Sequence, residues 1–438
     1  MPQAPDRTDA SMSRTLADWL AYIERQHPSA IALGLERVRA VAARMGLGRP
    51  ARHVVTVGGT NGKGSTVAFI EAIARAAGWT VGAYTSPHLL AYNERVRIDG
   101  RDAGDDALVA AFEAVEAARA GGDGDIALTY FEYGTLAALW LFERDRLDLA
   151  ILEVGLGGRL DAVNLVDADV AVVTTVDLDH QDWLGDDREV IGFEKAGIAR
   201  AWKPLVLGED DPPSSVLGHA YAIGASTWRA GNDFFFERID AAHWRWREVG
   251  FELELPMPAL AAPVQLRNAA TAIAALRALD APIPGRAWAE GVAGARLPGR
   301  LQRFERDGVE VLVDVGHNPQ AARELARWLA QVPVQGRTCA VYAALGDKDV
   351  AGVADALAGV VDEWWLAGLE EAGPRGTPVD ALARRLEGTA AGAGERHRDV
   401  AGALAAARRR ARPGDRILVF GSFHTAAVAL AALAAGGS

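Results

Sequence analysis

The residues with the clearest chemical potential form the glycine-rich run Gly58-Gly59-Thr60-Asn61-Gly62-Lys63-Gly64-Ser65-Thr66. The run follows an apolar, β-rich stretch at residues 53–57 and precedes an alanine-rich stretch with helical spacing. Glycines let backbone N–H groups face phosphate oxygens, the helix N-terminus adds partial positive charge, and Lys63 can reach the β- and γ-phosphates. The run departs from the common P-loop pattern, because the spacing from Gly58 to Lys63 is one residue short and Gly64 precedes the hydroxyl of Ser65. A turn without a ligand is the alternative, but the strand–loop–helix context predicts a phosphate-binding loop.

Further polar side chains follow other apolar stretches. Glu153 comes directly after the four apolar residues 149–152, where an open parallel sheet presents its functional groups. A carboxylate there can hold Mg²⁺ beside phosphates, and a glutamate that faces solvent is the weaker interpretation. The stretch 170–176 leads to Asp179 and His180. By position alone His180 is either a structural residue or a ligand, and the Glu194-Lys195 pair is typical of a solvated helix surface.

The second half of the chain repeats this arrangement at three strand ends. They carry Gly316-His317-Asn318-Pro319, Asp347-Lys348-Asp349 and Gly421-Ser422-Phe423-His424-Thr425. Each segment alone could form only a turn and a helix cap, because Asp, Ser and Asn cap helices readily. Three polar strand ends on one sheet instead predict a common edge that faces the phosphate loop across a cleft.

The elements that must position these groups alternate along the chain. Short β-rich runs separated by helical segments predict βαβ units around a parallel sheet that is buried on both faces. The runs fall into two series, 53–57, 147–154, 170–176 and 204–207, then 309–315, 338–345, 363–367 and 416–420. The Gly/Pro-containing stretch 294–299 suits a linker, and the aromatic-rich residues 209–262 predict antiparallel strands attached to the first sheet. We expect two α/β domains, at residues 1–296 and 297–438, the first about twice as large as the second.

Composition narrows the class of protein. The 438 residues include 58 acidic and 46 basic side chains, so the formal charge is -12, which disfavours general binding to nucleic acid or membranes. The single cysteine, Cys339, excludes an internal disulfide and a cysteine-zinc site. The small-apolar run 426–435 is about half of a membrane span, and no basic segment followed by an apolar one opens the chain. These features predict a cytoplasmic protein of more than one domain.

Taken together, the motifs resemble the folylpolyglutamate synthase family of the Mur-ligase superfamily. The similarity runs from about residue 16 to about residue 427, and the extra glycine in the phosphate loop is this family's usual form. Beyond that loop, the motifs that carry the resemblance are Ser86-Pro87-His88-Leu89, Glu94-Arg95-Val96-Arg97, Thr129-Tyr130-Phe131-Glu132, Glu153-Val154-Gly155-Leu156-Gly157-Gly158-Arg159-Leu160-Asp161-Ala162, Asp179-His180, Glu194-Lys195-Ala196-Gly197-Ile198, Arg267-Asn268-Ala269-Ala270, Leu297-Pro298-Gly299-Arg300, Asp314 with His317-Asn318-Pro319, Asp347-Lys348-Asp349, and Gly421-Ser422-Phe423-His424-Thr425.

The resemblance implies a P-loop ATPase-like N-terminal domain with a doubly wound sheet and an attached small antiparallel sheet, followed by a smaller Rossmann-like α/β domain. It also implies an ATP-dependent ligase that acts as a monomer. A substrate carboxylate would attack the γ-phosphate of ATP to form an acyl phosphate, and the amine of L-glutamate would displace phosphate. Mg²⁺ and Lys63 would neutralise charge in the first step. Such an enzyme joins L-glutamate to dihydropteroate and adds further glutamates to reduced folates.

The same resemblance assigns roles to residues. The positions that match ATP contacts are Thr60, Asn61, Gly62, Lys63, Gly64, Ser65, Asn268, Arg300 and Asp314. Ser86 and Glu153 would ligate one Mg²⁺ with Ser65 near it, and His180 would ligate a second. Lys195 matches a lysine that is N6-carboxylated in the family. His317 and Ser422 match positions near glutamate or the acyl phosphate, and Arg95 is a candidate for an anionic substrate.

Two segments match those that hold dihydropteroate in the family, namely Thr129, Tyr130, Phe131 and Glu132, and Leu160, Asp161 and Ala162. An aromatic pair beside a carboxylate suits a pterin, although spacing alone would place Tyr130 and Phe131 in a helix core. One departure bears on this pocket. Close relatives carry an aspartate of the dihydropteroate pocket where this chain has Ala32, so we expect weaker or relocated binding of the pterin.

Three alternatives stay open. A monofunctional folylpolyglutamate synthase would reject dihydropteroate. A peptidoglycan Mur ligase would share the chemistry, but the motifs at 129–132 and 421–425 favour folate. A nucleotide-dependent binding module that hydrolyses ATP slowly would need no second row of polar strand ends, and its turnover would not respond to glutamate.

Overall fold

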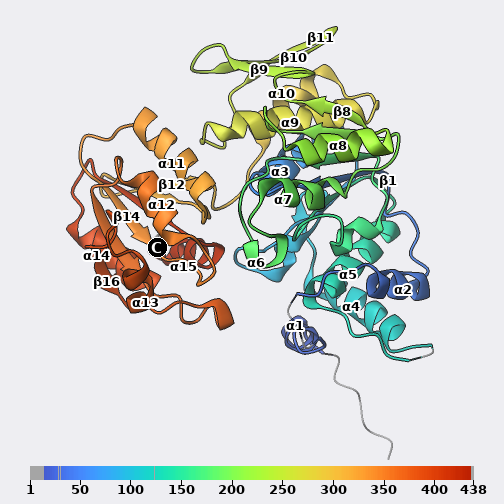
Figure 1. The fold of residues 1–438 in the computed structure, drawn as a ribbon, viewed down its shortest axis with the longest axis horizontal. Helices are drawn as coiled ribbons and strands as arrows, with labels where there is room; N and C mark the ends of the chain where they lie inside the picture. The colour runs from blue at the N-terminus through green and yellow to red at the C-terminus, as the bar shows by residue number, and fades with distance from the viewer. Residues whose placement is uncertain (1–13, 28, 30, 123, 436–438) are drawn as a thin grey trace, which may run out of the picture.

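The computed structural model describes residues 14–435 except Pro28, Ala30 and Asp123. The predicted lack of a leader at the N-terminus concerns residues outside this range. Figure 1 shows two α/β units side by side, a larger one from the first two thirds of the chain and a smaller one from the last third. In the described part of the chain, no helix is long and apolar enough to cross a membrane.

The larger unit is built on an eight-stranded sheet with the order β4-β3-β2-β5-β1-β6-β7-β8, in which the strands from β2 to β8 pair in parallel. Its strands are β1 (Ala51–Gly58), β2 (Val81–Tyr84), β3 (Val96–Ile98), β4 (Arg101–Asp102), β5 (Leu147–Glu153), β6 (Val170–Val173), β7 (Pro204–Leu207) and β8 (Ser226–Arg229). The predicted strands at β1, β5, β6 and β7 are confirmed. The antiparallel pair β3–β4 and the strand β2, with two to four residues each, were not predicted from the sequence pattern.

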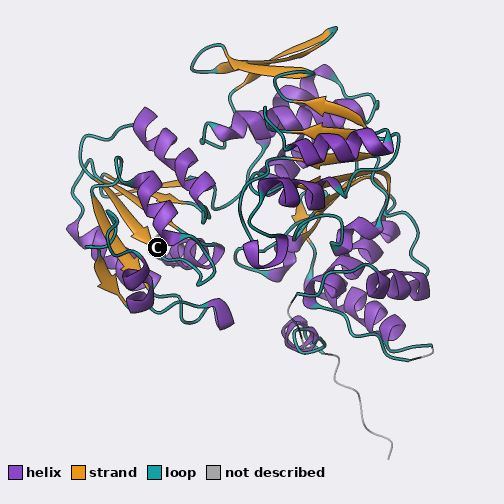
Figure 2. Ribbon diagram, in the orientation of Figure 1, coloured by secondary structure: helices purple, strands orange, loops and turns teal. Residues whose placement is uncertain are grey.

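Helices cover both faces of this sheet (Figure 2). The helices of the larger unit are α1 (Leu16–Ile23), α2 (Glu36–Met45), α3 (Lys63–Ala76), α4 (Asp105–Arg119), α5 (Tyr130–Asp145), α6 (Gln181–Leu184), α7 (Arg188–Ala196), α8 (Ser214–Ile223), α9 (Val264–Ala278) and α10 (Gly285–Gly294), of which α1 packs on α4 rather than on the sheet. Alternate residues of β1 belong to different cores: Val54 packs with α4 and α5, whereas Val55 and Val57 pack with α3 and α9. This two-sided burial explains why the strands are almost wholly apolar.

The aromatic-rich middle of the chain forms a separate three-stranded antiparallel sheet of β9 (Phe234–Arg238), β10 (His243–Glu248) and β11 (Phe251–Pro256). Trp244 and Trp246 are fully buried, and Trp246 Nε1 donates to the carbonyl of Ala270 in α9 at 3.1 Å. The small antiparallel sheet is therefore confirmed and lies against α9. The same region also contains α8 and the parallel strand β8, which the sequence pattern did not predict.

The smaller unit has a six-stranded sheet with the order β12-β13-β17-β14-β15-β16, in which only β12 is antiparallel. Its elements are β12 (Gln302–Arg306), β13 (Val309–Val313), α11 (Pro319–Gln331), β14 (Thr338–Tyr342), α12 (Val350–Leu357), β15 (Glu363–Ala367), α13 (Val379–Arg385), β16 (Glu395–His397), α14 (Val400–Arg410), β17 (Arg416–Phe420) and α15 (Phe423–Ala435). The domain boundary between residues 296 and 297 stays a prediction.

Three strands end earlier than the sequence pattern predicts. β6 ends at Val173, β13 at Val313 and β14 at Tyr342, two or three residues short in each case. The apolar residues that follow, such as Val176 and Val315, are buried outside the ladders. The loops that begin there carry the polar residues of the site.

Candidate active site

A cavity of about 1300 Å³ lies between the two units, at the carboxyl ends of β1, β5, β6, β13, β14 and β17. The predicted site residues that line it are Thr60, Asn61, Gly62, Lys63, Gly64, Ser65, Ser86, Arg95, Thr129, Tyr130, Phe131, Glu132, Glu153, Leu160, Asp161, Ala162, His180, Asn268, Arg300, Asp314, His317 and Ser422. Lys195 is buried nearby but does not line the cavity. The structure thus brings together groups from ten sequence motifs.

The phosphate loop connects β1 to α3, and α3 begins at Lys63. Gly62 has a φ of +87°, and a Cβ there would lie 2.6 Å from Asn268 Oδ1. Gly59 likewise leaves no room, because a Cβ would lie 1.9 Å from Thr174 Oγ1. Glycine is therefore required at both positions. The resulting turn aims the unpaired N–H groups at the start of α3 into the cavity, which is the arrangement that binds phosphate.

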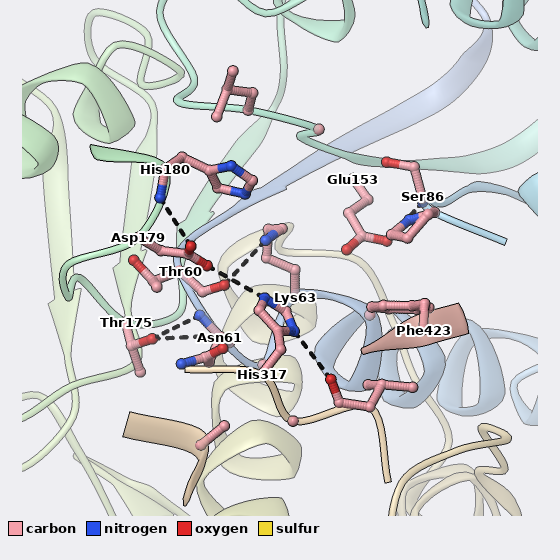
Figure 3. Close-up of a pocket in the computed structure, with 18 of the residues that line it drawn as sticks. Thr60, Asn61, Lys63, Ser86, Glu153, Thr175, Asp179, His180, His317 and Phe423 are labelled. Carbon is pink, nitrogen blue, oxygen red and sulfur yellow. Dashed lines mark hydrogen bonds and ion pairs between the residues drawn. The ribbon is translucent and has the colours of Figure 1, made fainter. Parts of the chain in front are cut away.

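Lys63 lies at the centre of the cavity, between the Ser86–Glu153 contact and the Asp179–His180 segment (Figure 3). Its Nζ donates to the carbonyls of Gly59 and Thr60 at 3.0 and 3.2 Å. The ammonium group is therefore held over the loop whose N–H groups would surround a phosphate.

The carboxylate of Glu153 is suited to a divalent cation. It is 5% exposed, burial raises its pKa, and it accepts a hydrogen bond from the backbone N–H of Ser86 at 3.2 Å. An isolated buried carboxylate is costly unless a cation compensates it. Among the described residues no group of three His, Cys, Asp or Glu side chains could hold a metal. One carboxylate with two serine hydroxyls instead fits Mg²⁺, which keeps waters and phosphate oxygens as its other ligands.

Asp179 joins the two units on the other side of Lys63. Its Oδ1 lies 2.7 Å from Lys348 Nζ and its Oδ2 lies 3.4 Å from His317 Nε2. Burial alone would raise the pKa of Asp179, but the hydrogen bond and charge of His317 and the charge of Lys348 hold it well below its usual value. His180 is next in the chain, and burial lowers its pKa to about 4. A neutral imidazole at pH 7 is a competent metal ligand.

Lys195 lies in α7 and is 4% exposed. Burial, and then the positive charge of Lys63, lower its pKa to about 7. Near neutral pH a large fraction of this amine is uncharged, whereas an ordinary lysine is not. A neutral amine is the form that can react with CO₂.

The predicted pterin residues all line this cavity. Asp161 caps the segment that follows it, and its carboxylate accepts the N–H groups of Gly155, Leu156 and Val163 at 2.9–3.1 Å. Burial nevertheless raises its pKa to about 7. Tyr130 and Phe131 open α5 and face this cavity, so they are wall residues rather than helix core.

Two further details concern the same pocket. Ala32 lines the cavity with no polar side chain, but its carbonyl accepts a hydrogen bond from Arg37 at 2.7 Å. Arg95 lies 5.4 Å from the ring centres of both Tyr92 and Tyr130, and its Nε donates to His88 Nδ1 at 2.9 Å. The guanidinium group is thus oriented by aromatic rings and a histidine while one end stays available to an anion.

The smaller unit supplies the opposite wall. Asp314 accepts the N–H groups of Leu301 and Gly316, and opposite charges link it to the partly buried Arg300. Ser422 is 3% exposed and caps α15, accepting the N–H of Thr425 at 2.9 Å. Residues that sequence reasoning missed also line the cavity, including Gln320, Glu209 and Trp183. Gln320 and Trp183 lie close to recognised motifs in the sequence, whereas Glu209 follows the strand β7 and adjoins no motif.

Comparison with known proteins agrees with this geometry. Residues 57–276 match the Mur ligase middle domain, and residues 299–423 match the Mur ligase glutamate ligase domain. The fold and the site together therefore define a ligase of the Mur type.

The relatives are more specific. The dihydrofolate synthase/folylpolyglutamate synthase of Escherichia coli K12 is 49% identical over 413 residues, covering 94% of each chain. The structure of E. coli FolC in complex with DHPP and ADP superposes with a TM-score of 0.91, 48% identity, and coverage of 97% of this chain and 99% of that one. A bifunctional folylpolyglutamate synthase/dihydrofolate synthase with Mn, AMPPNP and L-glutamate bound gives a TM-score of 0.88, 46% identity, and coverage of 99% and 100%.

The chain belongs to the dihydrofolate synthase/folylpolyglutamate synthase family. It is accordingly a carbon–nitrogen ligase, which confirms the family and the reaction class predicted from its motifs.

Proposed function

We propose that this protein uses Mg-ATP to join L-glutamate to dihydropteroate, forming dihydrofolate, and to add further glutamates to reduced folates. The observation that carries the proposal is the single cavity in which the phosphate loop of the larger unit faces the polar strand ends of the smaller one. A site split in this way can hold an acid, a nucleotide and an amine at once, which hydrolysis of ATP would not require.

The first step activates the acid. One oxygen of the substrate carboxylate attacks the γ-phosphorus of ATP, and the bond to the β-phosphate oxygen breaks to release ADP. Lys63 and the N–H groups at the start of α3 would stabilise the charge on the phosphoryl group. Glu153, Ser86 and Ser65 would hold Mg²⁺, and His180 would hold a second ion. The metal, when bound, would offset the negative charge of the phosphates.

The second step forms the amide. The amine of L-glutamate attacks the acyl phosphate carbon, loses a proton and displaces inorganic phosphate. His317 and Ser422, from the smaller unit, are proposed to lie near glutamate and the acyl phosphate. Asn268, Arg300 and Asp314 would hold ATP between the units. Arg95 would bind an anionic part of the acid substrate.

The pocket around Asp161 supports the proposal that the acid substrate carries a pterin. Its aromatic residues offer stacking, and a carboxyl group with a pKa of about 7 can accept or donate a hydrogen bond. Relatives named for both activities support the bifunctional reaction. A monofunctional folylpolyglutamate synthase is the second candidate, because Ala32 supplies no carboxylate at its own position in the pocket.

We further propose N6-carboxylation of Lys195, a cytoplasmic monomer, and a division of the chain at residues 296 and 297. The lowered pKa of Lys195 supports the modification, since carbamate formation needs the neutral amine.

The deciding experiment measures phosphate release from Mg-ATP with L-glutamate, using dihydropteroate or tetrahydrofolate as the acid. Glutamate-dependent turnover with both acids is the expected result. Turnover with tetrahydrofolate alone would favour the monofunctional candidate and point to Ala32. Phosphate release that does not respond to glutamate would refute the ligase proposal.

A further inference from the structure

Three segments far apart in the sequence form one wall of the cavity around Asp161. We name residues 31–34, 129–132 and 160–162 the pocket wall, and all of them line the cavity. Two of the three belong to loops, and one backbone hydrogen bond, from Gly34 N to Leu160 O at 3.3 Å, joins the first segment to the third. Loops need such ties to keep a defined shape.

The first two segments are tied by Arg37, which lies in α2 and does not itself line the cavity. Its Nη2 donates to the carbonyl of Ala32 at 2.7 Å and to Glu132 Oε1 at 2.9 Å. Its Nε lies 3.4 Å from Glu132 Oε2. One guanidinium group therefore bridges a loop carbonyl and a carboxylate 95 residues away.

The carboxylate of Glu132 accepts three hydrogen bonds from the protein. Besides Arg37, its Oε2 accepts the N–H of Thr129 at 2.8 Å, and its own N–H donates to Thr129 Oγ1 at 3.2 Å. The residue is 3% exposed. An ionised carboxylate has about four acceptor positions, and the guanidinium and the helix cap occupy three of them. Little capacity is left for a substrate.

We propose that Arg37 and Glu132 are positioning residues that hold the pocket wall in the shape that recognises the heteroaromatic part of the acid substrate. The inference rests on the proposed function, and it changes the predicted role of Glu132 from direct contact to support of the wall. Arginine is suited to this task because its planar fork can serve two acceptors at once, whereas a lysine ammonium group cannot reproduce that geometry.

The test compares Arg37→Met, Arg37→Lys, Glu132→Gln and the double variant Arg37→Met/Glu132→Gln with the wild-type protein. Arg39→Met is the matched control, since Arg39 lies on the same helix and is exposed. KM for dihydropteroate, KM for ATP and the thermal midpoint Tm are measured for each. We expect Arg37→Met to raise KM for dihydropteroate at least tenfold, with KM for ATP changed less than twofold, and Arg37→Lys to fall between it and the wild type.

The double variant separates positioning from stability. Arg37→Met leaves Glu132 buried without its partner and should lower Tm, because an uncompensated buried charge is costly. Glu132→Gln in the same chain removes that charge, so Tm should recover while KM for dihydropteroate stays high. Recovery of both quantities would reduce the pair to a stability role and overturn the inference. A rise in KM confined to Glu132→Gln, with Arg37→Met at the wild-type value, would also overturn it, because Glu132 would then contact substrate.

The wild-type measurement keeps the two proposals distinguishable. If the wild-type protein used neither dihydropteroate nor tetrahydrofolate, the proposed function itself would fail. If it used dihydropteroate and Arg37→Met behaved like Arg39→Met, only the positioning role would fail.

Discussion

At the scale of the residue, the amine of Lys195 is prepared for reaction by its surroundings. Burial and the neighbouring charge of Lys63 lower its pKa to about 7. The neutral amine can form an N–C bond to CO₂ and release a proton, so carbamate formation becomes more favourable as pH rises through about 7. We expect bicarbonate to stimulate turnover of protein depleted of CO₂, more strongly at pH 8 than at pH 6.

The same residue provides a spectroscopic readout. Protein equilibrated with ¹³C-bicarbonate should show a carbamate carbon signal, and Lys195→Met should lack it and lose on the order of 100-fold in kcat. Lys203→Met, at an exposed position, is the matched control. Full activity of Lys195→Met would contradict any role for this amine in the reaction.

At the scale of the element, one carboxylate shapes the loop that carries Ser86. The oxygens of Glu94 accept the backbone N–H groups of Leu89, Leu90 and Ala91 at 2.7, 2.7 and 2.8 Å. Hydrogen bonds to a charged acceptor are stronger than neutral ones. Glu94 therefore holds the loop in the conformation that places the N–H of Ser86 on Glu153.

Replacing Glu94 by glutamine should loosen this loop, although the side chain keeps nearly the same size. The amide oxygen of glutamine can still accept a hydrogen bond. Its amide nitrogen is a donor, however, and would face backbone N–H groups, with which it cannot form a hydrogen bond. We expect a loss of about 1–3 kcal/mol in the free energy of unfolding and a several-fold rise in the Mg²⁺ concentration that gives half-maximal velocity. Urea unfolding and a Mg²⁺ titration measure the two effects. Glu113→Gln, on the exposed face of α4, should change neither.

Local patterns predicted the elements whose signals lie within one stretch of chain. The phosphate loop and Glu153 were found because glycine spacing and a strand end are local features. The local pattern does not single out Lys195, because the adjacent charged residues Glu194 and Lys195 are typical of a solvated helix surface, and only the family resemblance points to this lysine. In α7 successive side chains point about 100° apart, so Glu194 pairs with Arg159 at 2.8 Å while Lys195 turns inward. Arg37 gave no signal either, since its partner Glu132 is distant in the sequence.

At the scale of the whole molecule, apolar and polar contacts both join the two units across the cavity. Leu89 of the larger unit packs against a hydrophobic cluster of the smaller one that contains Val315 and Ala426. The polar contacts include reciprocal hydrogen bonds between Asn61 and Asn318 at 3.1 Å and the buried ion pair of Asp179 with Lys348. Because the site is divided between the units, its geometry depends on these contacts.

A variant of this ion pair tests how much the polar contacts contribute to holding the two units together. Lys348 and Asp179 side chains are 6% and 10% exposed, and removing one partner of a buried pair costs about 3–5 kcal/mol. In Lys348→Met the arrangement with the two units in contact is destabilised by this amount, because Asp179 is buried there without its partner. When the units separate, Asp179 is hydrated again. We therefore expect a larger radius of gyration by solution X-ray scattering and a drop in kcat of at least tenfold. Arg323→Met removes an exposed ion pair to Asp177, whose side chains are 51% and 29% exposed, and should change both by little. If Lys348→Met kept the wild-type radius and rate, the ion pair would not be needed to hold the units together, and the contacts that remain, the packing of Leu89 and the hydrogen bonds between Asn61 and Asn318, would be sufficient.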